Sequence, residues 1–219
     1  MALGKASVPI TSAAVAMLCV LGLSGCGDEG ARPPKLPYES WYLGLAAPRH
    51  MEVWVESVDV LDQRGFAFFR VNAGVASYTR KTEGWHKGGG SNKPATNVDL
   101  PERIFVRWQS LAEQKTYKIG IEIPQWVRDE MVQPNHVWCE PAKEELVLYK
   151  DTINLGMAPG GIVKVWYGGT CLGYTELGRY QANIDPLGPR KDGTHKYFRG
   201  PNPEAQAYID KHGIPYSSW

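Results

Sequence analysis

Met51-Glu52-Val53-Trp54-Val55-Glu56 is the stretch that decides the fold, because apolar and polar residues alternate along it as they do in a half-buried strand. The alternation shifts phase at Ser57 and resumes over residues 58–60, which predicts a β-bulge. Residues 62–65 have the composition of a turn, and the apolar run 66–71 follows. We therefore predict that residues 51–71 form a β-hairpin.

Strand patterns also dominate the rest of the chain. They predict strands at residues 75–79, 103–108, 115–123, 145–149 and 162–167. Residues 103–108 and 115–123 are expected to pair antiparallel, because only a short connection separates them. Residues 155–161 are predicted to form a tight turn, since they contain a proline and several glycines.

Helical patterns are few and short. Residues 125–132 predict two helical turns, with Trp126 and Val127 facing the core. A C-terminal helix is predicted from the cap residue Asn202, with Pro203 in the first position, to Gly213. The expected fold is mainly β (α+β): an antiparallel sheet or sandwich of about seven to nine strands with one or two short helices, the C-terminal one included.

Residues 1–25 have the parts of an export signal: Lys5 as the positive region and the apolar run 13–23. That run is too short to span a membrane as a stable helix. The ending Leu23-Ser24-Gly25-Cys26 resembles the lipobox of bacterial lipoproteins, in which the cysteine is acylated and becomes the new N-terminus. The alternative is a plain export signal with a coincidental cysteine. We expect lipidation of Cys26, and two or more acyl chains, at about 0.8 kcal/mol per buried methylene, would anchor the protein permanently.

The remaining chain divides into a tether and a domain. Residues 26–38 are rich in proline and glycine and lack an apolar period, which predicts an extended tether. Residues 39–219 are expected to form a single β-rich globular domain. Gly27 follows the cysteine where aspartate would retain a lipoprotein in the inner membrane, and resemblance to this enterobacterial sorting rule implies the inner leaflet of the outer membrane, facing the periplasm. Without residues 1–25 the chain has 23 basic and 23 acidic side chains, so its net charge does not favour nucleic acid.

Two cysteines are left for the domain, because Cys19 departs with the leader and Cys26 carries lipid. We predict a disulfide between Cys139 and Cys171, since an exported protein meets an oxidising compartment. Such a bond would contribute about 3–4 kcal/mol in the chain-entropy model. Two buried free thiols are an alternative. A metal site that uses His136 with these cysteines is a third, although it lacks a fourth ligand at a recognised spacing.

A long polar loop at residues 81–100 contains Gly88-Gly89-Gly90-Ser91-Asn92. It is not a phosphate-binding loop, because Lys93-Pro94 follows it and no helix begins there. Loops of this length in compact domains are often functional. The residues predicted to contact a partner are Trp85, His86, Gly88, Gly89, Gly90 and Asn92.

Aromatic residues are abundant, with eight tryptophans and eleven tyrosines. The strand patterns place Trp54 and Trp166 on the face opposite to their neighbouring valines. These indoles either pack beneath loops or the C-terminal helix, which is the favoured interpretation, or form an exposed binding surface.

Catalytic motifs are not apparent in the sequence. The five histidines are scattered, and the mature chain has no Gly-x-Ser-x-Gly, His-Glu-x-x-His or Cys-x-x-Cys pattern. Adjacent carboxylates such as Asp129 and Glu130 point in different directions, so they do not form an acid/base pair. We therefore predict a protein that is not an enzyme and that uses no cofactor or metal.

Several motifs of the mature chain are similar to a family of proteobacterial lipoproteins classed as a domain of unknown function. The residues that carry the resemblance are Tyr42, 51–55, Gly84-Trp85, Leu100-Pro101, 105–111, 156–161, Val165-Trp166 and 214–219. Members of this and similar families are found beside phospholipase effectors of type VI secretion. The resemblance implies an immunity protein, and it supplies no active-site residue.

Three hypotheses follow from these observations. In the first, a lipid-anchored protein facing the periplasm binds a secreted phospholipase effector and neutralises it by covering its substrate entrance. In the second, an envelope-maintenance or glycan-binding lipoprotein recognises sugars through its tryptophans and has no effector partner. A hydrolase without recognisable motifs is the third.

Overall fold

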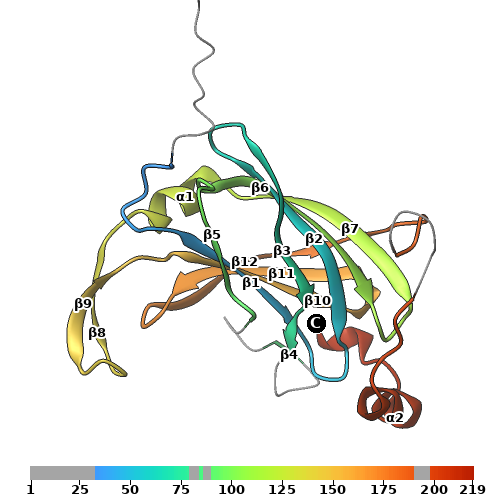
Figure 1. Cartoon of the computed structure of the whole chain (residues 1–219). Helices are drawn as coiled ribbons and strands as arrows, with labels where there is room; N and C mark the ends of the chain where they lie inside the picture. Colours follow the sequence, from blue (N-terminus) through green and yellow to red (C-terminus); the bar gives the residue numbers. More distant parts are fainter. Residues whose placement is uncertain (1–32, 79–83, 86–89, 190–197) are drawn as a thin grey trace, which may run out of the picture.

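The computed structural model describes residues 33–78, 84–85, 90–189 and 198–219 (Figure 1). These residues form 13 strands and two α-helices. One sheet, called sheet A, contains β1 (Trp41–Ala47), β4 (Ser77–Tyr78), β5 (Lys93–Ala95), β10 (Thr152–Ala158), β11 (Ile162–Gly169) and β12 (Gly173–Gln181). Sheet B contains β2 (Val53–Asp62), β3 (Ala67–Val75), β6 (Pro101–Ser110), β7 (Lys115–Glu122) and β13 (Asn183–Ile184). The remaining elements are β8 (Asn135–Cys139), β9 (Glu144–Leu148), α1 (Gln125–Met131), α2 (Pro203–His212) and the 3-10 turns at Pro159–Gly161 and Tyr216–Ser218. The predicted mainly β class is confirmed, with more strands than expected, partly because three of them have only two or three residues.

Sheet B is antiparallel and contains the hairpin that the sequence predicts. β2 pairs with β3 on one side and with β6 on the other, in the order β13-β7-β6-β2-β3. The register between β2 and β6 shifts between Val55 and Ser57, so the predicted bulge is confirmed. The expected antiparallel pairing of residues 103–108 with 115–123 is also confirmed, as β6 and β7.

Sheet A is mixed, because β1 lies parallel to both β10 and β4. Its order is β12-β11-β10-β1-β4, and β5 pairs antiparallel with β1. β1 has no recognisable strand pattern in the sequence, because its burial is nearly continuous rather than alternating. A strand buried on both faces lacks the period of two that marks a half-buried strand.

The predicted turn at residues 155–161 is wrong in its first half. Residues 155–158 belong to β10, which is buried along its whole length. Only Pro159–Gly161 turns, and Gly160 and Gly161 have φ angles of 78° and 75° there. Glycine adopts such left-handed conformations without the steric cost that other residues meet.

The hydrophobic core lies between the two sheets. Sheet A contributes residues such as Trp41 and Leu155, and sheet B contributes residues such as Val55 and Trp108, all with no exposed surface. The Trp41 indole Nε1–H donates to the Val98 carbonyl at 3.0 Å, which satisfies its one polar group. The core therefore joins segments that lie far apart in the sequence.

Helix α1 closes part of the core through one face. Val127 and Met131, four residues apart, are fully buried. Trp126 is 50% exposed, so the prediction that it faces inward is wrong. It lies one residue before Val127 and is therefore turned toward solvent, where its edge meets the Tyr167 ring at 5.8 Å between centroids.

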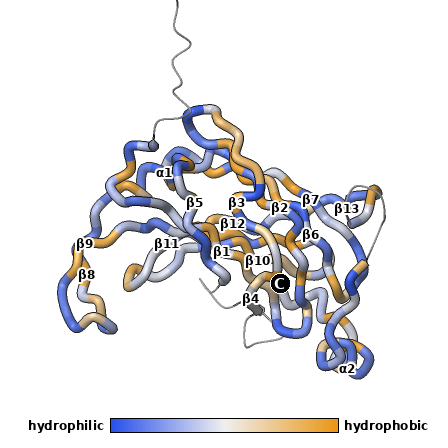
Figure 2. Tube along the Cα trace, viewed as in Figure 1, coloured by the Kyte–Doolittle hydropathy of each residue, from blue (hydrophilic) through white to orange (hydrophobic). Residues whose placement is uncertain are grey.

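The C-terminal helix α2 begins and ends as predicted. The Asn202 side chain accepts a hydrogen bond from the Ala205 N–H, and Gly213 is the C-cap with a φ of 74°. Figure 2 shows α2 as mostly hydrophilic, and Ala205 is its one buried residue. The helix is held at its sides by the Arg49–Glu204 ion pair at 2.8 Å and by stacking of Tyr208 on His50.

β8 and β9 pair only with each other and form a hairpin, residues 135–148, that we call the arm. Figure 1 shows the arm extending away from the two sheets. The predicted disulfide between Cys139 and Cys171 is present and fastens the arm to the turn between β11 and β12. The alternative of a metal site with His136 is therefore wrong, since both sulfur atoms are bonded to each other. No cluster of three or more metal-ligating side chains occurs among the residues that the structure describes.

The predicted tether is described only from residue 33. Leu36 and Tyr38, at its end, pack against the core. Cys26 and the predicted signal lie outside the described residues. Within the described ranges, no helix has the length and apolar composition needed to cross a membrane.

Candidate partner-binding surface

Residues 182–189, which we call the strap, cross the outer face of sheet B. Within the strap β13 pairs with β7, and the Asp185 N–H donates to the Thr116 carbonyl at 2.8 Å. The Arg107 side chain lies beneath the strap and is only 10% exposed. Its guanidinium donates to Asp185 Oδ2 at 2.8 Å and to the Gly188 carbonyl, and it also pairs with Glu56. The strap thus buries an arginine that two carboxylates neutralise.

The Arg107–Asp185 pair is a fixed support for this face. Burial acts to raise the pKa of Asp185, but the hydrogen bonds from Arg107 and from the Leu187 N–H bring that pKa below its usual value. Asp185 therefore stays ionised at neutral pH and holds the buried guanidinium in place. Lys118 adds a second cation at 3.5 Å from Asp185.

A groove of about 1070 Å³ opens beside the strap, on the outer face of sheet B. Its walls carry Trp54, Glu56 and Asp59 of β2, Phe69 and Arg70 of β3, Lys93 of β5, Arg107 and Gln109 of β6, and Pro189 and Arg199 from either side of residues 190–197. Four strands and the segments around the strap therefore contribute to one surface.

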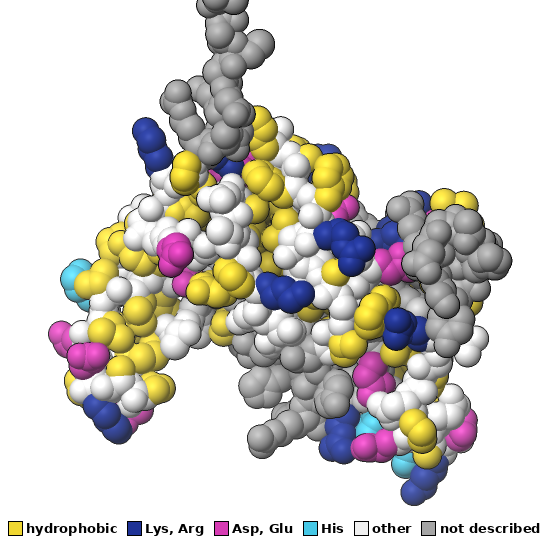
Figure 3. Space-filling view, viewed as in Figure 1, with side chains coloured by type: hydrophobic (Ala, Val, Ile, Leu, Met, Phe, Trp, Pro, Cys, Tyr) yellow, Lys and Arg dark blue, Asp and Glu magenta, His cyan; other side chains and the backbone are white. Residues whose placement is uncertain are grey.

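Three cations of the groove, Arg70, Lys93 and Arg199, form no ion pair with a carboxylate of the described residues. Lys93 Nζ donates to the Ala73 carbonyl at 3.2 Å. Asp59 Oδ1 accepts a hydrogen bond at 2.8 Å from the backbone N–H of Arg70, and not from its guanidinium. Figure 3 shows lysine and arginine side chains along this face of the molecule. The rim of the groove therefore attracts anionic groups.

Aromatic rings lie beside these cations. The Arg199 guanidinium lies over the Trp54 ring, 3.8 Å from the ring centroid. The backbone carbonyl of Arg199 accepts a hydrogen bond from the Gln109 side-chain amide. A stacked guanidinium keeps its N–H groups at the edge, where they can donate to an incoming carboxylate or phosphate. Phe69 is 78% exposed on β3. The groove thus combines apolar contact area with cationic hydrogen-bond donors, a combination typical of protein-binding surfaces.

The described residues of the predicted loop lie against sheet A. Trp85 packs on Trp166, with 5.4 Å between ring centroids. Gly90 approaches the Leu45 backbone so closely that a Cβ would lie 3.0 Å from the Leu45 nitrogen. Asn92 is exposed, with its side-chain oxygen near Gly44. His86, Gly88 and Gly89 lie outside the described residues.

These contacts give Trp85 and Gly90 a structural role against sheet A, and partner binding by the loop stays a prediction. Lys93, the residue that follows Asn92, lines the groove. Sequence reasoning missed the groove cations, because Arg70 and Arg199 are ordinary surface residues until the fold brings them together.

The two tryptophans singled out by their strand positions are covered to different degrees. Trp166 is 2% exposed beneath Trp85. Trp54 is half-buried beneath Arg199. The favoured interpretation, in which the indoles pack under other segments, is therefore confirmed for Trp166. Trp54 is only partly covered and also lines the groove.

Two packed sheets, a strap and a cation-rimmed groove define a β-sandwich domain with one polar face. The chain belongs to a family of proteins of unknown function, DUF2931, whose model matches residues 28–217. No curated protein and no solved structure is significantly similar to the chain.

Proposed function

We propose that this chain is a lipid-anchored immunity protein that faces the periplasm and neutralises a phospholipase effector of type VI secretion by binding it. The observation that carries the proposal is the groove, with its aromatic walls and three cations that have no carboxylate partner among the described residues. Such a surface suits an acidic segment of a protein partner better than a small neutral ligand. The lipobox-like sequence at Cys26 supports the proposed location, and the family resemblance supports the proposed class of partner.

Anchoring fits this role, because an inhibitor that stays at the membrane meets the enzyme where its substrate lies. The test is metabolic labelling with palmitate, in which the parent protein should be labelled and the Cys26→Ala variant should not. The variant should also leave the membrane fraction, since a single substitution removes every acyl chain. An unlabelled parent protein would remove the anchoring part of the proposal.

The proposal predicts that a phospholipase gene adjoins this one, and neutralisation is tested with the enzyme that this gene encodes. The purified chain should bind this enzyme and abolish its hydrolysis of phospholipid vesicles, and cells that lack the gene should be killed by sister cells that deliver the enzyme. The proposal would be contradicted if no neighbouring gene encoded a phospholipase. It would also be contradicted if the enzyme stayed active when the chain was present in excess.

Charge reversal tests the groove itself. The double variant Arg70→Glu and Arg199→Glu should bind the enzyme at least about tenfold more weakly, with most of the loss in the association rate at low salt. Lys211→Glu, which changes an exposed cation on α2, is the matched control and should bind like the parent. Binding of a peptidoglycan or polysaccharide probe by the parent, without any binding of the enzyme, would favour the glycan-binding alternative.

A further inference from the structure

The arm presents apolar surface on a narrow, protruding element. Trp138 and Val147 are 53% and 50% exposed although they lie on paired strands. In the register of the hairpin, Trp138 is opposite Glu145 and His136 is opposite Val147. These four side chains consequently share one face of the arm, because residues directly opposite each other in a hairpin point the same way.

The arm is built to hold its shape without packing under the sheets. An isolated two-stranded hairpin is marginally stable in water. Here the disulfide between Cys139, next to the turn of the hairpin, and Cys171 fixes the turn end of the arm to the connection between β11 and β12 of sheet A. The Trp138 indole donates to Glu140 Oε2 at 2.6 Å, so the exposed ring is also oriented. A pre-organised apolar side chain on a fixed protrusion loses little conformational entropy when it enters a pocket.

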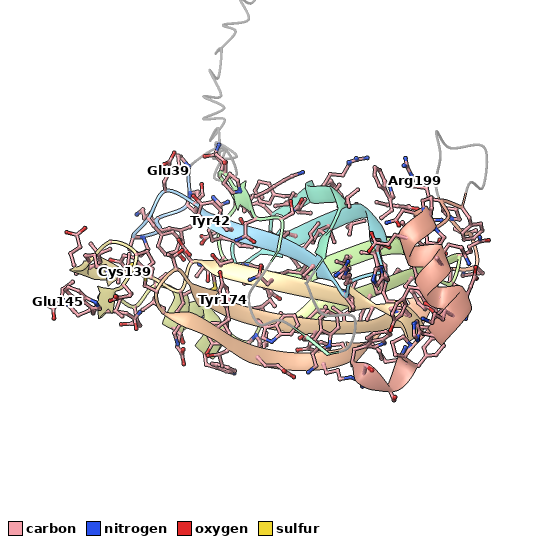
Figure 4. The ribbon with its side chains drawn as sticks, turned by 90° about the horizontal axis from the view of Figure 1, so that it is seen from below. Glu39, Tyr42, Cys139, Glu145, Tyr174 and Arg199 are labelled. Carbon is pink, nitrogen blue, oxygen red and sulfur yellow. A yellow bond between two sulfur atoms is a disulfide. The ribbon has the colours of Figure 1, made fainter. Side chains whose placement is uncertain are left out.

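The charge of the arm is opposite to that of the groove. Residues 135–148 contain Glu140, Glu144 and Glu145 against the single cation Lys143. Lys143 pairs with Glu140 at 2.5 Å, and the hydrogen bond from Lys143, together with that from Trp138, lowers the pKa of Glu140. Glu144 and Glu145 form no ion pair with a described residue and are exposed. Figure 4 shows Cys139 and Glu145 at one end of the molecule and Arg199 near α2 at the other.

We infer that the arm enters the substrate entrance of the phospholipase and occupies it in place of a phospholipid. The inference rests on the proposed function and adds the chemistry of the contact. An enzyme that acts on phospholipids must receive an anionic phosphate and apolar acyl chains side by side. The arm offers the Glu145 carboxylate beside the apolar Trp138 and Val147, so one face of it matches both features of that entrance. Glu144, opposite Cys139 on the other face, adds to the negative charge of the arm. The cationic groove does not match the substrate entrance. Because the groove lies at the opposite end of the molecule from the arm, it can bind another part of the enzyme.

Two arm variants and two matched controls test this inference by titration against the adjoining phospholipase. Trp138→Ala should weaken binding and inhibition by about ten- to thirtyfold, the loss typical of a central interface aromatic. Glu144→Lys with Glu145→Lys should slow association by at least about tenfold at low salt and much less at high salt. Trp126→Ala removes an equally exposed tryptophan outside the arm. Glu39→Lys with Glu102→Lys reverses two exposed carboxylates elsewhere. Both controls should behave like the parent.

A second measurement asks whether the arm and the substrate share one site. A short-chain ether analogue of phosphatidylglycerol, with a phosphonate in place of the phosphate ester where the enzyme cleaves at phosphorus, is not hydrolysed and should displace the parent chain competitively. Each variant should retain its disulfide by thiol titration and its far-ultraviolet circular dichroism, so that a loss of binding is not a loss of folding. Arm variants that bind as tightly as the parent, or a parent that binds without competing with the ether lipid, would overturn the inference and leave the proposed function intact. A parent that does not bind the enzyme would end both.

Discussion

At the scale of single residues, Gly156 shows how closely the outer face of sheet A is packed. A Cβ at this position would lie 2.5 Å from Trp85 Cζ3 and 2.7 Å from Trp166 Cζ3. Both distances are shorter than any real carbon–carbon contact, so a side chain would displace one indole. The loop that contains Trp85 can therefore lie against the sheet only while residue 156 is glycine.

We expect Gly156→Ala to lower the free energy of unfolding by about 1–3 kcal/mol, as other overpacking substitutions do. Its tryptophan signals in near-ultraviolet circular dichroism should change, because the Trp85–Trp166 pair must separate. Gly200→Ala is the control, since a Cβ there meets no atom within 4 Å. Equal stability and an unchanged tryptophan spectrum in Gly156→Ala would mean that the indoles do not pack as described.

This residue also marks a limit of sequence reasoning. The pattern placed Trp166 on the face away from the core, which is correct, but it could not say what covers that face. The glycines and proline of residues 155–161 predict a turn that includes Gly156, because glycine is common in turns. In the structure it is a strand residue whose missing side chain makes room for tryptophan, a reason that depends on a segment about seventy residues away.

At the scale of elements, the strands and helix with a local signature were predictable and the long-range pairings were not. β2 and β3 alternate and meet across a turn, and α2 has a cap at each end, so neighbouring residues suffice to recognise them. β1 is buried on both faces and pairs with β10, more than a hundred residues later. The groove needs the register of β2, β3 and β6 together with Arg199, which no local pattern reveals.

The arm gives the prediction at this scale. Replacing Cys139 and Cys171 with serine should lower the free energy of unfolding by about 3–4 kcal/mol in the chain-entropy model, because the disulfide closes a loop with a sequence separation of 32. Amide hydrogen exchange in residues 135–148 should accelerate more than exchange in β2 and β6, since the arm loses its attachment while the core keeps its packing.

Reductant serves as the internal control for this variant. It should destabilise the parent by a similar amount and leave the serine variant unchanged. If the free energy of unfolding of the parent did not change when its disulfide was completely reduced, the disulfide would not contribute to stability. Protection in the arm that equals protection in the core would show that the arm is held by more than the disulfide.

At the scale of the whole molecule, cationic and anionic side chains gather at opposite ends of the folded domain. The domain is nearly neutral in total, yet within the described residues the groove rim carries cations without an ion pair and the arm at the opposite end carries carboxylates without one. Opposite charges at opposite ends orient a protein in the field of a partner during encounter. One partner with both an acidic and a basic surface could therefore contact the two ends together, which links the two parts of the proposal.

The buried tyrosines make the stability of the whole domain sensitive to alkaline pH. Burial, with the hydrogen bond to Glu130, raises the pKa of Tyr167 to about 12. Burial, with the nearby Glu113 carboxylate, raises the pKa of Tyr117 further. In the unfolded chain a tyrosine loses its proton near pH 10. Above that pH the folded form binds more protons than the unfolded form, so stability is complete below about pH 10 and is lost as the pH rises toward the folded pKa values.

We expect the midpoint of urea unfolding to fall steadily above about pH 10. The part of the tyrosinate absorbance that Tyr117→Phe removes should appear together with unfolding rather than before it. Tyr117→Phe should make the midpoint less sensitive to alkaline pH, because it removes one proton that only the unfolded chain releases. It should also lower stability at neutral pH, where the Tyr117 hydroxyl donates to Glu113 at 3.0 Å. Tyr42→Phe alters a tyrosine that is 38% exposed and serves as the matched control. If the unfolding midpoint of Tyr117→Phe fell with rising pH as steeply as that of the parent, proton release by Tyr117 would not be coupled to unfolding. The Tyr117 hydroxyl would then not be shielded from solvent in the folded protein.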